Sequence, residues 1–458
     1  MNVLLANPKS TNAFEAFGFV FPPLGLLYVA AATEQAGHKV AIEDFCVSGH
    51  KLSSFDFNDY EMVGITTDTR RFRGALKIAE SARQQGCKVV MGGSHPGFAD
   101  EEILGSGLVD YIVRGEGEVT FPLLLDALQS GSDPSSVAGI SYISNGNIKR
   151  TSTPALIEDL DALPMPARHL VDMELYKRKG LKYGGQRPVA VISSSRGCPY
   201  NCSFCITPQM YGKKWRARSA SSVVSEIEHV YHKYGYRAFA FCDDNFTVSP
   251  QRVKDICSLI IEKGLDIWWW CLSSPALLLK NEDMVGLMAK AGTKTVYIGV
   301  ESANPAALKE FNKGITQDIP FRAIDLLRRN GIEAFGSFIL GGLNDTVATT
   351  LATIRHARKL NTAVAQFTIL TPYPGTALYN EMAPLLRHRK WHLYDGVHLV
   401  FRHSKMPFVL MELLLILAYT GFYARGFGPL KKFFRAFAKN APILKRVFGK
   451  AAPNGPQA

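Results

Sequence analysis

Apolar and polar residues alternate along the first third of the chain in the rhythm of short strands separated by amphipathic helices. The first two helical patterns are each closed by a glycine, Gly37 and Gly86. This alternation predicts an α/β domain in which a doubly wound parallel sheet is covered by helices on both faces. The strands are expected at residues 3–6, 39–44, 62–66, 88–91 and 109–113, and the helices at residues 24–35, 73–85 and 119–129.

A second alternating series begins at Pro188 and has six apolar strand patterns separated by helical patterns. Six such units predict a partial (β/α)6 barrel, in which reactive residues gather at the carboxyl ends of the strands. In the third strand, Trp268 and Trp270 are expected on one face and Trp269 on the other, mostly as barrel packing and in part as a substrate wall. The strands are expected at residues 189–193, 237–242, 267–272, 295–300, 333–340 and 365–370.

These patterns divide the chain into four segments. Residues 1–140 are expected to form the first α/β domain and residues 188–385 the barrel. Between them, residues 141–187 lose the alternation and carry three prolines and a turn sequence at 144–147, which is typical of a connector. Residues 386–458 are expected to form a helical carboxyl-terminal extension.

The carboxyl-terminal extension is apolar first and basic afterwards. Residues 406–424 contain a single acidic residue, Glu412, whereas residues 425–458 contain eight basic residues and no acidic one. A membrane span needs about 20 apolar residues, so the apolar run is borderline. A basic tail with interleaved aromatic residues is typical of a helix lying on an anionic bilayer. The pattern favours peripheral membrane contact through residues 406–450. Packing of this segment against the barrel mouth is the second alternative, and a membrane span is the least favoured.

Composition limits the function classes. The chain has 458 residues, of which 47% are hydrophobic and 20% charged, as expected for a globular protein of more than one domain. Without the eight basic residues of the tail, the net charge of +12 falls to +4 over residues 1–424, which argues against a nucleic-acid partner. The first residues, Met1–Pro8, lack a basic flank and a cleavage site, so we expect a cytoplasmic protein, with membrane association through the extension.

Three cysteines follow the first barrel strand at CxxxCxxC spacing: Cys198, Cys202 and Cys205. Three thiols on one turn favour metal binding, and three thiolates on a four-iron cluster would leave one iron free for a ligand that is not protein. Structural zinc usually takes four ligands in two spaced pairs, and no second pair lies in a matching loop. A disulfide framework is also not indicated, because the eight cysteines are scattered over a long chain.

The cysteine motif, with Phe204 before the third cysteine, resembles the signature of the radical S-adenosylmethionine (SAM) superfamily. The resemblance implies a [4Fe-4S] cluster whose open iron binds SAM. It also implies an external one-electron reductant of the flavodoxin or ferredoxin type, and reductive cleavage of SAM to a 5'-deoxyadenosyl radical. The loop at 341–346 lacks the proline and glutamate usual in the family, and an acidic residue at a strand end can also be a helix cap. The residues that the resemblance assigns to SAM are Phe204, Asp243, Asp244, Glu301, Ser302, Lys313 and Gly341.

Loops at the strand ends of the first domain, together with residues 22–25, resemble a flavodoxin-like cobalamin-binding domain. Each loop taken alone also fits a tight turn. The loop at 7–11 lacks the histidine that some of these domains use as a cobalt ligand, and His95 is expected beside the corrin rather than on the cobalt. The residues assigned to cobalamin are Thr66, Thr67, Gly92, Gly93, Ser94, His95, Gly115 and Glu116.

Over residues 1–400 the chain resembles the group that contains radical SAM C-methyltransferases and the anaerobic magnesium-protoporphyrin monomethyl ester oxidative cyclase. The resemblance implies cobalamin-dependent methylation of an unactivated carbon in a hydrophobic, lipid-like or tetrapyrrole, substrate. The alternative is oxidative cyclisation or carbon–carbon bond formation with the same cofactors. A non-enzymatic cobalamin sensor is disfavoured because all three thiols are present.

Overall fold

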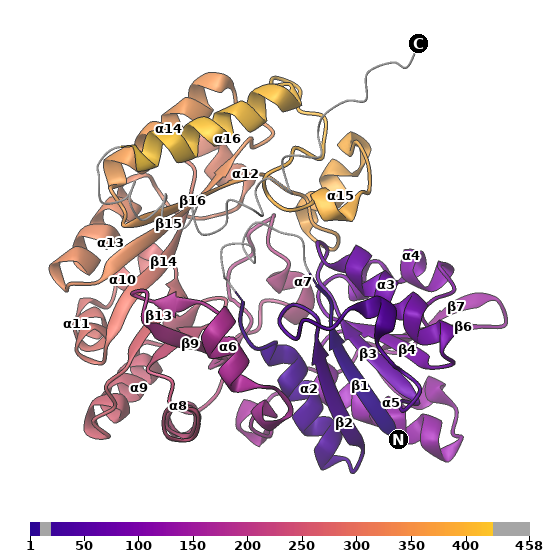
Figure 1. Cartoon of the computed structure of the whole chain (residues 1–458). Helices are drawn as coiled ribbons and strands as arrows, with labels where there is room; N and C mark the ends of the chain where they lie inside the picture. The colour runs from indigo at the N-terminus through magenta and orange to yellow at the C-terminus, as the bar shows by residue number, and fades with distance from the viewer. Residues whose placement is uncertain (10–19, 425–458) are drawn as a thin grey trace.

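The computed structural model describes residues 1–9 and 20–424 and consists of two α/β halves that lie side by side (Figure 1). The first half contains a seven-stranded sheet in the order β2-β1-β3-β4-β5-β6-β7. Its first five strands are parallel, as predicted. They are β1 (Asn2–Asn7), β2 (Lys39–Asp44), β3 (Met62–Thr66), β4 (Lys88–Gly92) and β5 (Tyr111–Val113), and the helices are α2 (Leu24–Gln35), α3 (Phe72–Gln84), α4 (Asp100–Gly105) and α5 (Gly117–Ser130).

The first sheet contains two more strands than the sequence pattern indicates. The turn at 144–147, expected in a connector, instead joins β6 (Ile140–Ser144) to β7 (Asn147–Arg150). β6 pairs antiparallel with β5, so the hairpin completes one edge of the sheet. The rest of the connector contains α6 (Met173–Lys179) and the short strand β8 (Lys182–Tyr183), which pairs with the barrel sheet.

The second half is the predicted partial barrel, a curved sheet in the order β16-β15-β14-β13-β12-β9-β8. Six strands are parallel, and β8 adds an antiparallel edge. The parallel strands are β9 (Arg187–Ile192), β12 (Ala238–Phe241), β13 (Trp268–Ser273), β14 (Thr293–Glu301), β15 (Glu333–Leu340) and β16 (Val364–Ile369). The helices are α8 (Ala220–Tyr234), α9 (Pro250–Glu262), α10 (Pro275–Leu279), α11 (Glu282–Lys290), α12 (Pro305–Glu310), α13 (Asp318–Arg329), α14 (Val347–Leu360) and α15 (Ala377–Met382).

The three tryptophans of β13 divide between the two faces of the sheet, as the strand period requires. Trp269 is buried, meets the ring of Phe241 edge-on and the ring of Phe246 at a tilt, and donates from Nε1 to the carbonyl of Ala291 at 2.8 Å. Trp268 faces the other side, where the Arg187 guanidinium lies 4.2 Å from its ring centroid. Packing therefore accounts for both side chains.

Helix α16 (Phe408–Tyr423) covers the open edge of the barrel sheet along β16. The Tyr419 hydroxyl accepts from the backbone N–H of Phe367 and donates to its carbonyl, at 3.2 and 2.9 Å. Tyr423 does the same at Ala365, at 3.2 and 3.0 Å. Two tyrosines thus take the place of a further strand on an edge that would otherwise expose unpaired backbone groups. Within residues 1–9 and 20–424, no helix is long and apolar enough to cross a membrane.

Candidate active site

The three cysteines lie in the loop between the two halves. A short hairpin of β10 (Ser195–Arg196) and β11 (Arg216–Ala217) frames this loop, and α7 (Thr207–Tyr211) follows the third cysteine. Neighbouring barrel residues brace the loop, because Ser203 donates from its backbone N–H to the carbonyl of Phe311 at 3.1 Å, and the ring of Phe204 meets Phe311 edge-on at 5.5 Å. The geometry therefore gives Phe204 a packing role beneath the thiols.

The three thiols are free, partly buried and within electrostatic range of one another. Burial raises the pKa of Cys198 and Cys205, and raises the pKa of Cys202 to about 11. The ammonium group of Lys313 opposes this rise at all three thiols, because a nearby cation favours the thiolate. The loop therefore combines three soft ligands with one fixed positive charge.

This donor set fits a cluster better than a single ion. Among the described residues, no three histidine, cysteine or acidic side chains converge on one point, which is the arrangement that a single metal ion needs. In an iron–sulfur cluster each thiolate binds a different iron, so the sulfur atoms surround the cluster instead of meeting at one position. Three neighbouring thiols suit that second geometry.

At the end of β14, Lys313 Nζ donates to Glu301 Oε1 at 2.6 Å. Glu301 has a left-handed backbone with φ of 64°, an uncommon conformation that clusters at functional sites. Burial favours the neutral amine, but Glu301 and the nearby thiols raise the pKa of Lys313 above its ordinary value. Gly299 makes room for the pair, since a Cβ atom there would lie 2.4 Å from Glu301 Oε1 and 2.5 Å from Lys313 Nζ.

The two aspartates after β12 have different surroundings. Asp243 is buried and accepts from the backbone N–H of Ser194 at 2.7 Å and from the hydroxyls of Ser194 and Ser195 at 2.6 and 2.5 Å. Asp244 is exposed and accepts from the Thr207 hydroxyl at 2.8 Å. Its exposed surface opens into the cavity and not into bulk solvent, and the protein around the cavity desolvates the carboxylate and raises the pKa of Asp244 above its ordinary value. Asp243 thus has a structural role, whereas Asp244 is available to a ligand.

Two other residues assigned to SAM are engaged in protein contacts. The Ser302 hydroxyl accepts from the backbone N–H of Asn304 at 3.0 Å and lies 3.2 Å from Thr353 Oγ1. At Gly341, with φ of 78°, a Cβ atom would lie 2.6 Å from the Met411 methyl carbon of α16. In this structure these positions fix the strand ends and the helix above them.

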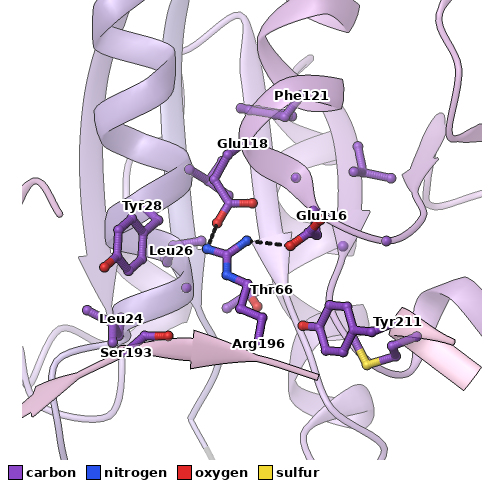
Figure 2. Close-up of a pocket in the computed structure, with 18 of the residues that line it drawn as sticks. Leu24, Leu26, Tyr28, Thr66, Glu116, Glu118, Phe121, Ser193, Arg196 and Tyr211 are labelled. Carbon is purple, nitrogen blue, oxygen red and sulfur yellow. Dashed lines mark hydrogen bonds and ion pairs between the residues drawn. The ribbon is translucent and has the colours of Figure 1, made fainter. Parts of the chain in front are cut away.

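A cavity of about 390 Å³ lies between the two halves (Figure 2). Its amino-terminal side is formed by the ends of β3, β4 and β5 and by the first turns of α2 and α5. Its barrel side is formed by Ser193, Ser195, Arg196, Ile206, Thr207, Met210, Tyr211, Cys242 and Asp244. A second hollow lies at the opposite end of the barrel, around Trp268 and Lys294, where barrel enzymes do not carry their active sites.

The strand-end loops of the first half form one wall of the cavity. Gly93 has φ of 110°, and a Cβ atom there would lie 2.5 Å from the carbonyl oxygen of Thr67, so only glycine allows this tight loop. Of the residues assigned to cobalamin, five line the cavity: Thr66, Gly92, Gly93, Gly115 and Glu116. Thr67, Ser94 and His95 do not line it.

His95 has a packing environment instead. Its ring lies 4.7 Å from Phe72 and 5.3 Å from Trp391, and its Nδ1 lies 3.1 Å from the Thr69 hydroxyl. Burial lowers the pKa of His95 to about 4, so the imidazole is neutral near pH 7. Trp391 belongs to the carboxyl-terminal extension, which the sequence pattern did not place over this loop.

Sequence reasoning missed Arg196, although it directly precedes Gly197 and Cys198. Its guanidinium lies in the cavity between two carboxylates of the first half, 2.7 Å from Glu116 Oε1 and 2.5 Å from Glu118 Oε1 (Figure 2). Hydrogen bonds from Arg216 and Arg196 outweigh the effect of burial and hold the pKa of Glu116 below its ordinary value. In the sequence, only the alternation of glycine and glutamate over residues 115–118 drew attention to the two carboxylates that bind Arg196.

Two family models match the chain. The radical SAM superfamily matches residues 192–357, which cover the thiol loop and most of the barrel. The B12 binding domain matches residues 13–125, which cover most of the first sheet.

Curated relatives match along most of their length. The chain is 36% identical to an uncharacterized methyltransferase of Pyrococcus horikoshii, over 93% of each chain. It is 28% identical to the bacteriochlorophyllide d C-12(1)-methyltransferase of Chlorobaculum tepidum, over 88% of this chain and 83% of the relative. It is 27% identical to the anaerobic magnesium-protoporphyrin IX monomethyl ester cyclase of Rubrivivax gelatinosus, over 89% of this chain and 74% of the relative.

Among solved structures, the fold is similar to that of the cobalamin-dependent S-adenosylmethionine radical enzyme OxsB with aqua-cobalamin bound. The TM-score is 0.77 at 17% identity, and the match covers 99% of this chain and 74% of OxsB. At this identity the likeness concerns the fold alone.

Proposed function

Because the chain belongs to the radical SAM superfamily, in the group that also carries a B12-binding domain, we propose that it methylates an unactivated carbon of a hydrophobic substrate. Its cofactors are a [4Fe-4S] cluster, SAM and cobalamin. When bound, they supply a carbon-centred radical and a transferable methyl group, and the protein aligns them. An external one-electron reductant of the flavodoxin or ferredoxin type is part of the proposal.

The observation that carries the proposal is the shared cavity. Loops assigned to cobalamin line this 390 Å³ space together with Arg196, Ile206 and Thr207, which flank the three cysteines, whereas the cysteines themselves do not line it. Both assigned cofactor regions therefore border one cavity, which supports the proposal. Cys198, Cys202 and Cys205 would hold the cluster, while Asp244, Glu301 and Lys313 offer the opposite charges that suit the ammonium and carboxylate of SAM. Thr66, Gly92, Gly93 and Gly115 would support the corrin.

The choice of a hydrophobic substrate rests on the relatives. The Chlorobaculum and Rubrivivax proteins are named for bacteriochlorophyllide and magnesium-protoporphyrin, both large tetrapyrroles. The second of these names also supports a runner-up, oxidative cyclisation with the same cofactors. The 36% identical relative is named a methyltransferase, which favours methyl transfer.

Product analysis separates these reactions. The protein is reconstituted anaerobically with iron, sulfide and hydroxocobalamin, reduced, and given SAM together with an apolar cell extract as the source of the methyl acceptor. We expect both S-adenosylhomocysteine and 5'-deoxyadenosine, because methyl transfer consumes SAM in two ways. Formation of 5'-deoxyadenosine alone would support the oxidative reaction, and formation of neither would revive the cobalamin sensor.

Peripheral membrane contact is a second proposal, and α16 carries it. One face of this helix packs on β16, but the opposite face exposes four aliphatic side chains, Val409, Leu413, Ile416 and Leu417, with exposed fractions of 46% to 59%. Residues 425–458 follow in the sequence and contain eight basic residues and no acidic one, but they lie outside the residues that the structure describes. An apolar stripe next to a basic segment suits an anionic bilayer surface.

Vesicle flotation tests the membrane proposal. We expect the protein to float with vesicles of phosphatidylglycerol and phosphatidylcholine, and to do so less at high salt, which screens surface charge. Leu413→Glu and removal of residues 425–458 should each reduce flotation. Ile261→Glu, at another exposed apolar position, is the matched control. Unchanged flotation in both altered proteins would refute the proposal.

A further inference from the structure

Arg196 connects the thiol loop, which belongs to the barrel half, to the first half of the molecule. The residue lies in β10, two positions before Cys198, and its side chain leaves the barrel to reach the first turn of α5. There it binds Glu116 and Glu118 with two different nitrogen atoms, at 2.7 and 2.5 Å. A single side chain therefore joins the beginning of the thiol loop to the loop that follows β5.

The planar guanidinium fixes both distance and orientation, because each of two nitrogens is bound to a separate carboxylate. The other oxygen of Glu116 is held as well, by Arg216 Nη1 and by the backbone N–H of Ile157, both at 2.8 Å. All four charged side chains expose 13% or less of their surface, so salt screens these contacts weakly.

The charge balance also limits what Arg196 can bind. Two carboxylates already accept from its guanidinium, and Arg196 and Arg216 together balance Glu116 and Glu118. This network leaves no net positive charge for an anionic ligand. Its effect is mechanical, since it fixes one loop against another.

We propose that Arg196 is a positioning residue that sets the spacing of the two cofactor sites by clamping the thiol loop to the amino-terminal end of α5. The inference rests on the proposed function, in which both cofactors act on one substrate. Misplacement of reacting groups by about 1 Å can cost on the order of 100-fold in rate. Two loops from separate halves need such a fixed link.

Hydrogen exchange of the cofactor-free protein tests the clamp itself. Glu118→Gln keeps the shape of the side chain but removes its charge, and Arg196→Lys keeps the charge but loses the two-point contact. We expect backbone amides of residues 197–206 to exchange at least about 10-fold faster in both variants, because opening of the loop is no longer opposed by the clamp.

Glu226→Gln is the matched control for hydrogen exchange. Glu226 is fully buried and accepts from Arg168 at 2.7 Å, from Arg218 and from the Tyr28 hydroxyl at 3.5 Å, none of which belongs to residues 197–206. The Glu226→Gln substitution should lower thermal stability without changing hydrogen exchange at residues 197–206. Unchanged exchange in Glu118→Gln and Arg196→Lys, or an equal rise in all three variants, would overturn the clamp.

Electron paramagnetic resonance then tests the spacing without any substrate. The reconstituted protein is reduced so that the cluster and cobalamin are both paramagnetic, and the dipolar coupling between them is measured. We expect one narrow coupling in the parent protein and in Glu226→Gln, and a broadened one in Arg196→Lys. A coupling that stays narrow in Arg196→Lys would overturn the positioning role.

A parent protein that binds no cobalamin would refute the proposed function, while hydrogen exchange would still decide whether the clamp exists.

Discussion

Lys313 Nζ lies 2.6 Å from Glu301 Oε1, and this ion pair stands beside the three thiols at the mouth of the barrel. The pair presents a cation and an anion side by side, which matches the ammonium and carboxylate of an amino acid. It is held by an uncommon left-handed backbone at Glu301 and by the absence of a side chain at Gly299.

Gly299→Ala should weaken SAM binding. The new Cβ atom would lie within 2.5 Å of both charged groups, so one of them must move. We expect the dissociation constant for SAM to rise at least about 10-fold, equal to roughly 1.4 kcal/mol. The change of the reduced-cluster spectrum on SAM addition reports it. Gly286→Ala is the control, since a Cβ atom there meets nothing closer than 3.6 Å; equal affinities in the two variants would contradict the assignment.

Replacing any one of the three loop cysteines by serine should prevent stable cluster assembly. The parent protein should bind roughly four iron atoms per chain after reconstitution, and each variant much less, because thiolates hold these clusters. Cys257→Ala, on the buried face of α9, should keep full iron content at a cost of about 1 kcal/mol in stability. Iron and sulfide analysis checks both, and retained iron in Cys202→Ser would be inconsistent with this ligand set.

Acid should selectively weaken the contact between Glu116 and the two arginines. Arg216 and Arg196 hold the folded-state pKa of Glu116 below its ordinary value. Its stabilisation is therefore complete above about pH 4.5 and disappears as the pH falls through the lower folded-state pKa. Glu116→Gln should cost about 3–5 kcal/mol near neutrality, since a buried pair loses one partner. Unfolding curves of the cofactor-free protein should show this difference shrinking below about pH 4.5; a constant difference would exclude the linkage.

Tyr423→Phe should destabilise the barrel edge. Its hydroxyl satisfies both backbone groups of Ala365, and the substitution leaves buried polar groups without a partner at a cost of about 1–3 kcal/mol. Tyr60→Phe, a partly buried tyrosine of the first half, should change stability by less than about 0.5 kcal/mol. Chemical unfolding monitored by circular dichroism measures both, and equal effects would show that the edge contact has little energetic weight.

The sequence predicted the repeating elements well, because strand and helix periods depend on neighbouring residues. β2, β3 and β15 begin and end where the apolar pattern does. The two members of the Glu301–Lys313 pair were both identified, although only the fold brings Lys313 back to the end of β14.

What the sequence did not reveal depends on contacts between distant segments. The hairpin of β6 and β7 joins the first sheet by pairing with the short strand β5. No local sequence pattern predicts this pairing. His95 is covered by Trp391, whose indole N–H donates to Glu102 at 2.8 Å. Arg196 meets Glu116 across the boundary between the halves. Such pairings follow from the relative position of two folded units and not from spacing along the chain.

The most direct test of the central claim follows the methyl group of SAM. The reconstituted, reduced protein is incubated with isotopically labelled SAM and an apolar extract of the cells that produce it, and label in the apolar fraction is measured. The account predicts incorporation of an intact labelled methyl group that requires both cobalamin and Cys198. Formation of 5'-deoxyadenosine without any labelled apolar product, or labelling that persists without cobalamin, would contradict it.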